Sequence, residues 1–175
     1  MPIPFETKRC RIRPFEESDI EAFMSYRNNL DWMQFQGFKG KKYLEYKAAL
    51  LMQPNFSEGV QLAVVDRQTG DLLGDLYLRL EKNTCWIGYT IAPQFARQGV
   101  AFEVVTQLLL QLQQAGLTLV KAGVEEQNHA SIQLLKKLGF TQTDSEGSEL
   151  IFQLDLQKID PATTEKNRQP NDHMR

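Results

Sequence analysis

The chain contains a segment whose residue types suit the binding of an anion. Residues 86–91 (Trp-Ile-Gly-Tyr-Thr-Ile) read as a strand, and residues 97–101 (Arg-Gln-Gly-Val-Ala) lead into an amphipathic helical pattern. A helix that begins at Gly99 leaves several backbone N–H groups unpaired at the positive end of its dipole. Gly99 also lets the backbone approach an oxyanion with no Cβ in the way, and Ala101 keeps the first turn narrow. This arrangement predicts a site for a phosphate or pyrophosphate.

A second group of polar residues, Asn128, His129 and Ser131, begins a later helical pattern that Gly139 ends. Histidine in the first turn of a helix is more often exposed and uninvolved in chemistry, so we expect no catalytic role for His129. Asn128 and Ser131 remain the residues of interest at this position.

Hydrophobic periodicity predicts the elements that position both motifs, in the order β-α-α-β-β-β-α-β-α-β-β. Strands are expected over residues 7–13, 60–66, 71–80, 84–91 and 117–124, at Phe140 and over 149–156. Helices are expected from Ser18 to about Asn28, with Ser18 and Glu21 as a capping box, over about 41–52, from Gly99 to Ala115, and over 128–138. The crossover after the meander favours parallel pairing of 84–91 with 117–124. The fold class is therefore α/β (α+β), with a mixed, mostly antiparallel twisted sheet of about six to seven strands and about four flanking helices.

The segment over residues 30–40 is rich in aromatic side chains, with Trp32, Phe35 and Phe38. Packing in the core is the more common use of such residues. The alternative is that they form one wall of a substrate pocket.

Length and composition indicate one globular domain over residues 1–159 and a disordered polar tail over 160–175. The formal net charge of −2 gives no electrostatic basis for binding nucleic acid. The short basic run over residues 39–42 reads as a solvated segment.

Cys10 and Cys85 stand far apart with no metal-ligand spacing, which predicts reduced thiols and no metal. No apolar run approaches membrane-spanning length, and the first residues do not read as a signal peptide. We therefore expect a cytoplasmic protein without a membrane partner.

The two motifs and the order of elements resemble the GNAT superfamily of acetyl-CoA-dependent N-acetyltransferases, and within it the RimJ/RimL-like branch that acetylates ribosomal-protein N-termini. The resemblance covers roughly residues 7–156 and is firmest over 87–140. It implies that acetyl-CoA binds between splayed strands, with its pyrophosphate on the loop before the helix and its pantetheine arm bonded to Asn128 like an added strand. The cofactor-binding residues implied are Ile91, Arg97, Gln98, Gly99, Val100, Ala101, Asn128 and Ser131.

The resemblance implies direct attack of an amine on the thioester, with Ser131 as the acid and Tyr89 as a further catalytic candidate. A thiolate is a fair leaving group, so a general acid is helpful rather than essential. Three positions depart from the family pattern. Trp86 stands where many members carry a glutamate base, Leu135 where many carry a tyrosine acid, and Ala96 where glutamine or arginine often starts the loop. The absence of that tyrosine is common in the RimJ/RimL-like branch.

Four residues are candidate replacements for the missing base: Asp75, Tyr77, Glu81 and Tyr89. Arg97 and Lys136 are candidates for phosphate contacts, with a solvated role as the alternative for Lys136. Glu103, in the first turn of the helix, is expected to have a structural role.

Two functions remain open. The first is transfer of acetyl to a primary amine, either a protein N-terminus or a small amine, since the chain lacks the acidic wall that a polycation favours. The second is a non-catalytic acyl-CoA-binding module of the same fold, acting as a sensor or partner domain. A dinucleotide-binding function is set aside because Gly-x-Gly-x-x-Gly is missing. A homodimer is common in the family.

Overall fold

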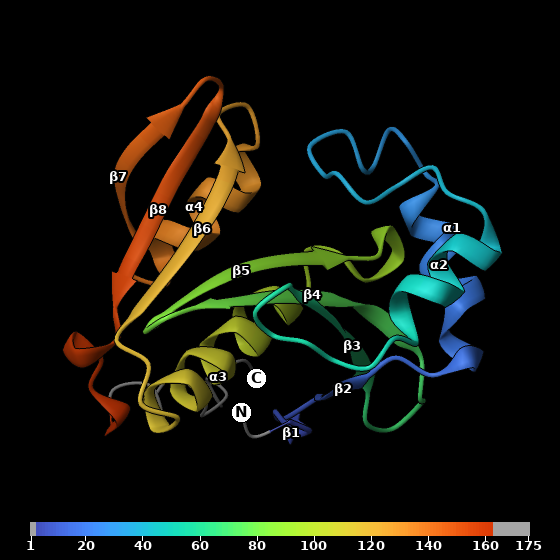
Figure 1. Ribbon diagram of the computed structural model, residues 1–175, viewed down its shortest axis with the longest axis horizontal. Coiled ribbons are helices and arrows are strands. Elements are labelled where there is room, and N and C mark those ends of the chain that lie inside the picture. The colour runs from blue at the N-terminus through green and yellow to red at the C-terminus, as the bar shows by residue number, and fades with distance from the viewer. Residues whose placement is uncertain (1–2, 163–175) are drawn as a thin grey trace, which may run out of the picture.

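The computed structural model describes residues 3–162, which form one open sheet of eight strands with four α-helices (Figure 1). The strands are β1 (Phe5–Glu6), β2 (Cys10–Pro14), β3 (Val60–Asp66), β4 (Leu72–Glu81), β5 (Thr84–Ile91), β6 (Leu119–Glu125), β7 (Thr141–Glu146) and β8 (Glu149–Asp155). The helices are α1 (Ile20–Arg27), α2 (Tyr43–Leu50), α3 (Val100–Gln114) and α4 (His129–Lys137). The strand order is β1-β2-β3-β4-β5-β6-β8-β7.

The sheet divides between β5 and β6, its one parallel pair over residues 3–162. These strands pair only from Thr84 to Trp86, against Leu119 to Lys121. Beyond Trp86 they diverge, and β6, β8 and β7 lean away from β5 in Figure 1. β6 pairs with β8 along its whole length, and beyond Lys121 its other edge is free of β5 and can receive a ligand. The predicted splay and the predicted parallel pairing are both confirmed.

Two apolar clusters cover the two faces of the sheet. On one face, α3 and α4 pack on strand residues that include Leu76 and Leu78. On the other, α1 and α2 pack on Ala63, Val65 and Leu72. Because strand side chains alternate, Asp75 lies on the α1–α2 face of β4, opposite Leu76 and Leu78.

The predicted order of elements is confirmed, with two differences in detail. The eighth strand, β1, has only two residues, too few for a periodicity signal. The predicted capping box at Ser18 is wrong: Ser18 lies within a 3₁₀ turn (Glu17–Asp19), and the N–H of Glu16 donates to Asp19 Oδ2 at 2.8 Å. Arg13 holds Asp19 in a part-buried ion pair at 2.7 Å, and the N-cap is Glu16, two residues earlier than Ser18.

Two further predictions concern the polar tail and the membrane. Most of the predicted polar tail, from residue 163 onward, lies outside the described residues. No helix within residues 3–162 is long and apolar enough to cross a membrane.

Candidate functional site

The loop between β5 and α3 has the backbone geometry of an anion site. A 3₁₀ turn (Pro93–Phe95) precedes it, and Arg97 and Gly99 both adopt left-handed conformations, with φ of 61° and 77°. Gly99 is the N-cap of α3, and no side chain of residues 3–162 caps the helix. The first N–H groups of α3 are therefore available to a ligand, as the sequence predicts.

Arg9 and Glu103 anchor this loop through an ion pair and a hydrogen bond. Arg9 Nε pairs with Glu103 Oε1 at 2.8 Å, and Arg9 Nη1 donates to the Gln98 carbonyl at 2.9 Å. The Thr7 hydroxyl donates to Glu103 as well. Burial alone would raise the pKa of Glu103, but these hydrogen bonds outweigh it and the pKa is lowered. Glu103 therefore has the expected structural role, and its charge is neutralised before an anion binds.

A cavity of about 550 Å³, the loop cavity, opens over the start of α3. It brings together seven of the eight predicted cofactor residues, which are Ile91, Arg97, Gly99, Val100, Ala101, Asn128 and Ser131. Gln98 does not line the loop cavity, and its backbone carbonyl accepts a hydrogen bond from Arg9. The cavity adds Lys137, which lies 4.2 Å from the Phe102 ring centre, whereas Lys136 is exposed and outside it.

Lys137 could have been found from helical spacing. Ala130, Leu134 and Lys137 follow one another at intervals of four and three, so they share a helix face, and all three line the loop cavity. Lys136 belongs to the neighbouring face. A cation is thus available for phosphate one residue later than expected.

Tyr89 and Ser131 meet across the gap between the two halves of the sheet. Their hydroxyl oxygens lie 2.8 Å apart, with Tyr89 on β5 and Ser131 in the first turn of α4. Burial raises the pKa of Tyr89 to about 12, although the contact with Ser131 opposes the shift. Tyr89 therefore stays protonated and able to donate at any physiological pH.

Asn128 fixes the start of α4. Its side-chain oxygen accepts the Ser131 N–H at 3.3 Å, which orients Ser131 toward the cavity. His129 is exposed and does not line the loop cavity, in agreement with the expectation that it is uninvolved.

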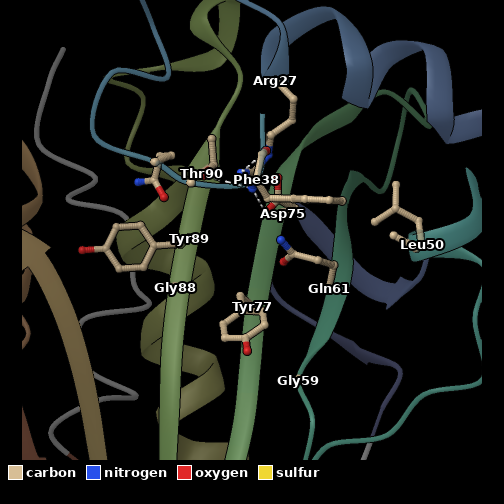
Figure 2. A pocket seen from close by; sticks show the side chains of 13 residues that line it. Arg27, Phe38, Leu50, Gly59, Gln61, Asp75, Tyr77, Gly88, Tyr89 and Thr90 are labelled. Atoms are coloured by element: carbon tan, nitrogen blue, oxygen red, sulfur yellow. Dashed lines mark hydrogen bonds and ion pairs between the residues drawn. The ribbon is translucent and has the colours of Figure 1, made fainter. Parts of the chain in front are cut away.

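A second cavity, the sheet cavity, lies on the α1–α2 face of β4 and β5 and has a volume of about 470 Å³ (Figure 2). Asp75 forms its floor and is 1% exposed. Arg27 Nη2 donates to Asp75 at 2.6 Å and to Thr90 Oγ1 at 3.3 Å, and the Tyr26 hydroxyl also donates to Asp75. Desolvation raises the pKa of Asp75, while Arg27 and the hydrogen bonds oppose it.

The four candidate bases have different positions. Asp75 and Tyr77 line the sheet cavity, but Asp75 is committed to its ion pair. Tyr89 reaches the other way, toward Ser131 (Figure 2). Glu81, at the end of β4, is exposed, pairs with Arg79 at 3.5 Å, and lines neither cavity.

Trp86 provides no replacement for the glutamate of the family pattern. Its ring lies between two cations, with Arg79 at 5.8 Å and Lys121 at 5.6 Å from the ring centre. It lines neither the loop cavity nor the sheet cavity.

The aromatic segment over residues 30–40 serves both of the uses considered. Phe38 packs edge-on against Tyr46 at 5.3 Å and also lines the sheet cavity. Trp32 is 41% exposed, donates from Nε1 to the Ile91 carbonyl at 2.9 Å and lines the loop cavity, as does Phe35. Core packing, the more common use, is therefore wrong for Trp32.

Tyr89 and Gln36 line both cavities, and they also line a small cavity of about 50 Å³ in the gap between β5 and β6. The three spaces thus meet at these two side chains. Sequence reasoning missed Gln36, since a glutamine in a loop carries no motif. Residues 3–162 contain no cluster of three or more His, Cys, Asp or Glu side chains that could hold a metal.

Comparison with known proteins places most of the chain in one family. Residues 9–141 match the family model described as an acetyltransferase (GNAT) domain. An uncharacterized N-acetyltransferase, YoaA of Bacillus subtilis (strain 168), is 28% identical over 145 residues, covering 77% of this chain and 81% of the relative.

Solved structures share the fold at low sequence identity. Ribosomal-protein-S5-alanine acetyltransferase from Vibrio fischeri superposes with a TM-score of 0.74 at 16% identity, covering 91% of this chain and 100% of that one. Spermidine N-acetyltransferase from Vibrio cholerae, in complex with CoA and spermine, has a TM-score of 0.72 at 16% identity, covering 86% and 97%.

Proposed function

Because the chain belongs to the family of GNAT acetyltransferase domains, we propose that it is an acetyl-CoA-dependent N-acetyltransferase acting on a primary amine, either a protein N-terminus or a small amine. The observation that carries the proposal is the meeting of three cavities at Tyr89, where its hydroxyl contacts Ser131. One cavity has the features of a pyrophosphate site, and another lies on the opposite side of β5 with room for an acceptor.

The loop cavity fits acetyl-CoA, which supplies an acetyl group activated as a thioester. The free N–H groups at the start of α3 suit its pyrophosphate, and Arg97 and Lys137 add positive charge at the same cavity. The free edge of β6 and the Asn128 side chain suit the amide groups of the pantetheine arm.

Tyr89 and Ser131 act on the leaving group. A pKa of about 12 keeps the Tyr89 hydroxyl protonated, so the pair donates a hydrogen bond to the sulfur as negative charge develops there. Ser131 lines the loop cavity, and Tyr89 lines both the loop cavity and the sheet cavity. The hydrogen bond to the sulfur is therefore supplied by a pair of hydroxyls, with Tyr89 on β5 and Ser131 on α4.

The sheet cavity receives the acceptor amine, with no free carboxylate to act as base. An α-amino group has a pKa of about 7.7–8.0, so a large fraction is already deprotonated near neutral pH. This favours a protein N-terminus or another weakly basic amine. The fold shared with a ribosomal-protein acetyltransferase is consistent with the RimJ/RimL-like branch.

Two observations favour a second candidate, a non-catalytic acyl-CoA-binding module. Trp86 replaces the usual glutamate, and Asp75 is tied to Arg27. Turnover of acetyl-CoA with any amine eliminates this candidate.

Calorimetric titration with acetyl-CoA tests the cofactor site. We expect the unaltered chain to bind, Asn128→Ala to bind about tenfold more weakly through loss of its hydrogen bonds, and the adjacent His129→Ala to bind normally. Absence of binding by the unaltered chain at millimolar ligand would refute the proposal.

A further inference from the structure

A fourth cavity of about 360 Å³, the outer cavity, continues the sheet cavity toward the surface between α2 and β3. The two spaces share four lining residues, Ala49, Leu50, Gly59 and Gln61. The outer cavity ends among residues 51–55, after α2, and near Phe15 on the other side. An acceptor whose amine lies near Tyr89 can therefore extend past Gln61 and out of the protein.

Gln61 occupies the junction with an unsatisfied group. Its Oε1 atom is buried and has no hydrogen-bond partner within residues 3–162. Figure 2 shows its side chain extending from β3 over β4, near Asp75 and Tyr77. A buried amide oxygen without a partner is destabilising and rare in native structures, so its retention calls for a functional explanation.

The walls that residues 3–162 form around the two cavities carry no acidic cluster that would favour a polycation. Arg27 and Asp75 form an ion pair, and the other ionisable side chains that line the two spaces are Tyr77, Tyr89 and Glu58. Apolar residues such as Phe38 and Leu50 line most of the remainder. A neutral, elongated molecule with N–H donors fits these walls, and a peptide backbone has these properties.

We propose that the outer cavity is a second acceptor subsite, which holds the residues of a linear peptide that follow its N-terminal one, and that Gln61 accepts a backbone N–H of this peptide at the junction. The inference rests on the proposed acetyltransferase function. It makes Gln61 a specificity-determining residue that distinguishes peptides from single amino-acid amides.

Two pools of acceptors test this subsite. One pool contains amino-acid amides, the other pentapeptide amides with the same first residues, and acetylation is followed by mass spectrometry at saturating acetyl-CoA. We expect kcat/KM for the pentapeptides to exceed that for the amides by about tenfold, the factor that one hydrogen bond contributes. Equal rates for the two pools would overturn the proposal.

Substitutions in α2 and just after it locate the effect. Gln53 is exposed and lines the outer cavity but not the sheet cavity, so Gln53→Trp should abolish the preference for pentapeptides while leaving the amides unaffected. Ala48→Trp is the control, because Ala48 is exposed on α2 and lines neither cavity. Gln61→Leu should remove the same preference without loss of acetyl-CoA affinity. Retention of the preference in Gln53→Trp would contradict the second subsite.

The test separates this inference from the proposed function. If acetyl-CoA binds and other amines are acetylated but neither the amino-acid amides nor the pentapeptides are, the subsite is refuted and the acetyltransferase function stands. If acetyl-CoA does not bind, the proposed function itself fails.

Discussion

The hydroxyl oxygens of Tyr89 and Ser131 lie 2.8 Å apart, although the residues are 42 positions apart in the chain. Tyr89 comes from β5 and Ser131 from α4, so the contact spans the gap where β5 and β6 separate. It places a neutral phenol and a hydroxyl at the point where the loop cavity and the sheet cavity meet. The proposed leaving-group chemistry depends on this pair.

Removal of either hydroxyl should slow acetyl transfer. We expect Tyr89→Phe and Ser131→Ala each to lower kcat by about 10²-fold, the lower end of what a general acid contributes. Since the two act as one unit, the double variant should be little slower than the worse single variant. Tyr43→Phe removes the same atom from α2 and should leave kcat unchanged. Multiplicative losses in the double variant would show that the two hydroxyls act independently.

The pH dependence of kcat/KM should be set by the pKa of the acceptor amine and not by a group of the enzyme. kcat/KM should rise with pH through the pKa of the acceptor amine, at about 7.7–8.0 for an α-amino group, because the amine must lose a proton to attack. It should then stay level to about pH 10, since the pKa of Tyr89 is raised to about 12 and its proton is retained. Initial rates across this range check the profile. A fall in rate between pH 8 and pH 10 would remove Tyr89 from the donor role.

Replacement of Gly99 should weaken acetyl-CoA binding more than it weakens the fold. Alanine at this position would have to adopt a left-handed conformation (φ of 77°), which costs about 1–2 kcal/mol. Relief of this strain would reorient the N–H groups at the start of α3. Gly116→Ala is the control, because Gly116 has a similar φ of 87° at the far end of α3, and a Cβ there would meet no atom of residues 3–162. Equal losses of acetyl-CoA affinity in both variants, measured by calorimetry, would mean that strain alone explains the effect.

The ion pair below the sheet cavity should be important for stability. The Arg27 and Asp75 side chains are 4% and 1% exposed, so Asp75→Asn leaves a buried guanidinium without its counter-charge and should cost about 3–5 kcal/mol in the free energy of unfolding. Urea unfolding followed by circular dichroism measures this loss. Glu17→Gln, which breaks the exposed pair with Lys47, should have little effect. If the Asp75→Asn and Glu17→Gln variants unfolded at the same urea concentration, the buried ion pair of Asp75 would not be important for stability.

Much of the fold could be predicted because its signals are local. The strands over 60–66 and 84–91 are rich in β-branched and other apolar residues and adjoin turn residues at 67–70 and at Asn83, and their predicted bounds match β3 and β5. The two-residue β1 could not be predicted, since pairing with β2 and not periodicity defines it. Ser18 was misleading because a hydrogen bond to Asp19, itself held by Arg13, decides where the cap lies.

The residues of the candidate site that belong to local sequence motifs could be predicted. Those that the fold brings together from distant segments could not. Gly99, Asn128 and Ser131 belong to local patterns that the loop cavity brings together. The roles of Gln36, Gln61 and Arg9 depend on segments distant in the chain, so no spacing reveals them. Lys137 shows an intermediate case, because helix periodicity identifies its face once Ala130 is known to line the cavity.

Acetyl transfer itself is the most direct test of the account. The purified chain is incubated with acetyl-CoA and a panel of primary amines, including peptides with a free N-terminus, and both thiol release and the mass of each amine are followed. We predict that at least one amine gains an acetyl group at a rate that Tyr89→Phe lowers and Tyr43→Phe does not. Binding of acetyl-CoA without acetylation of any amine would contradict the enzymatic function and favour the non-catalytic module.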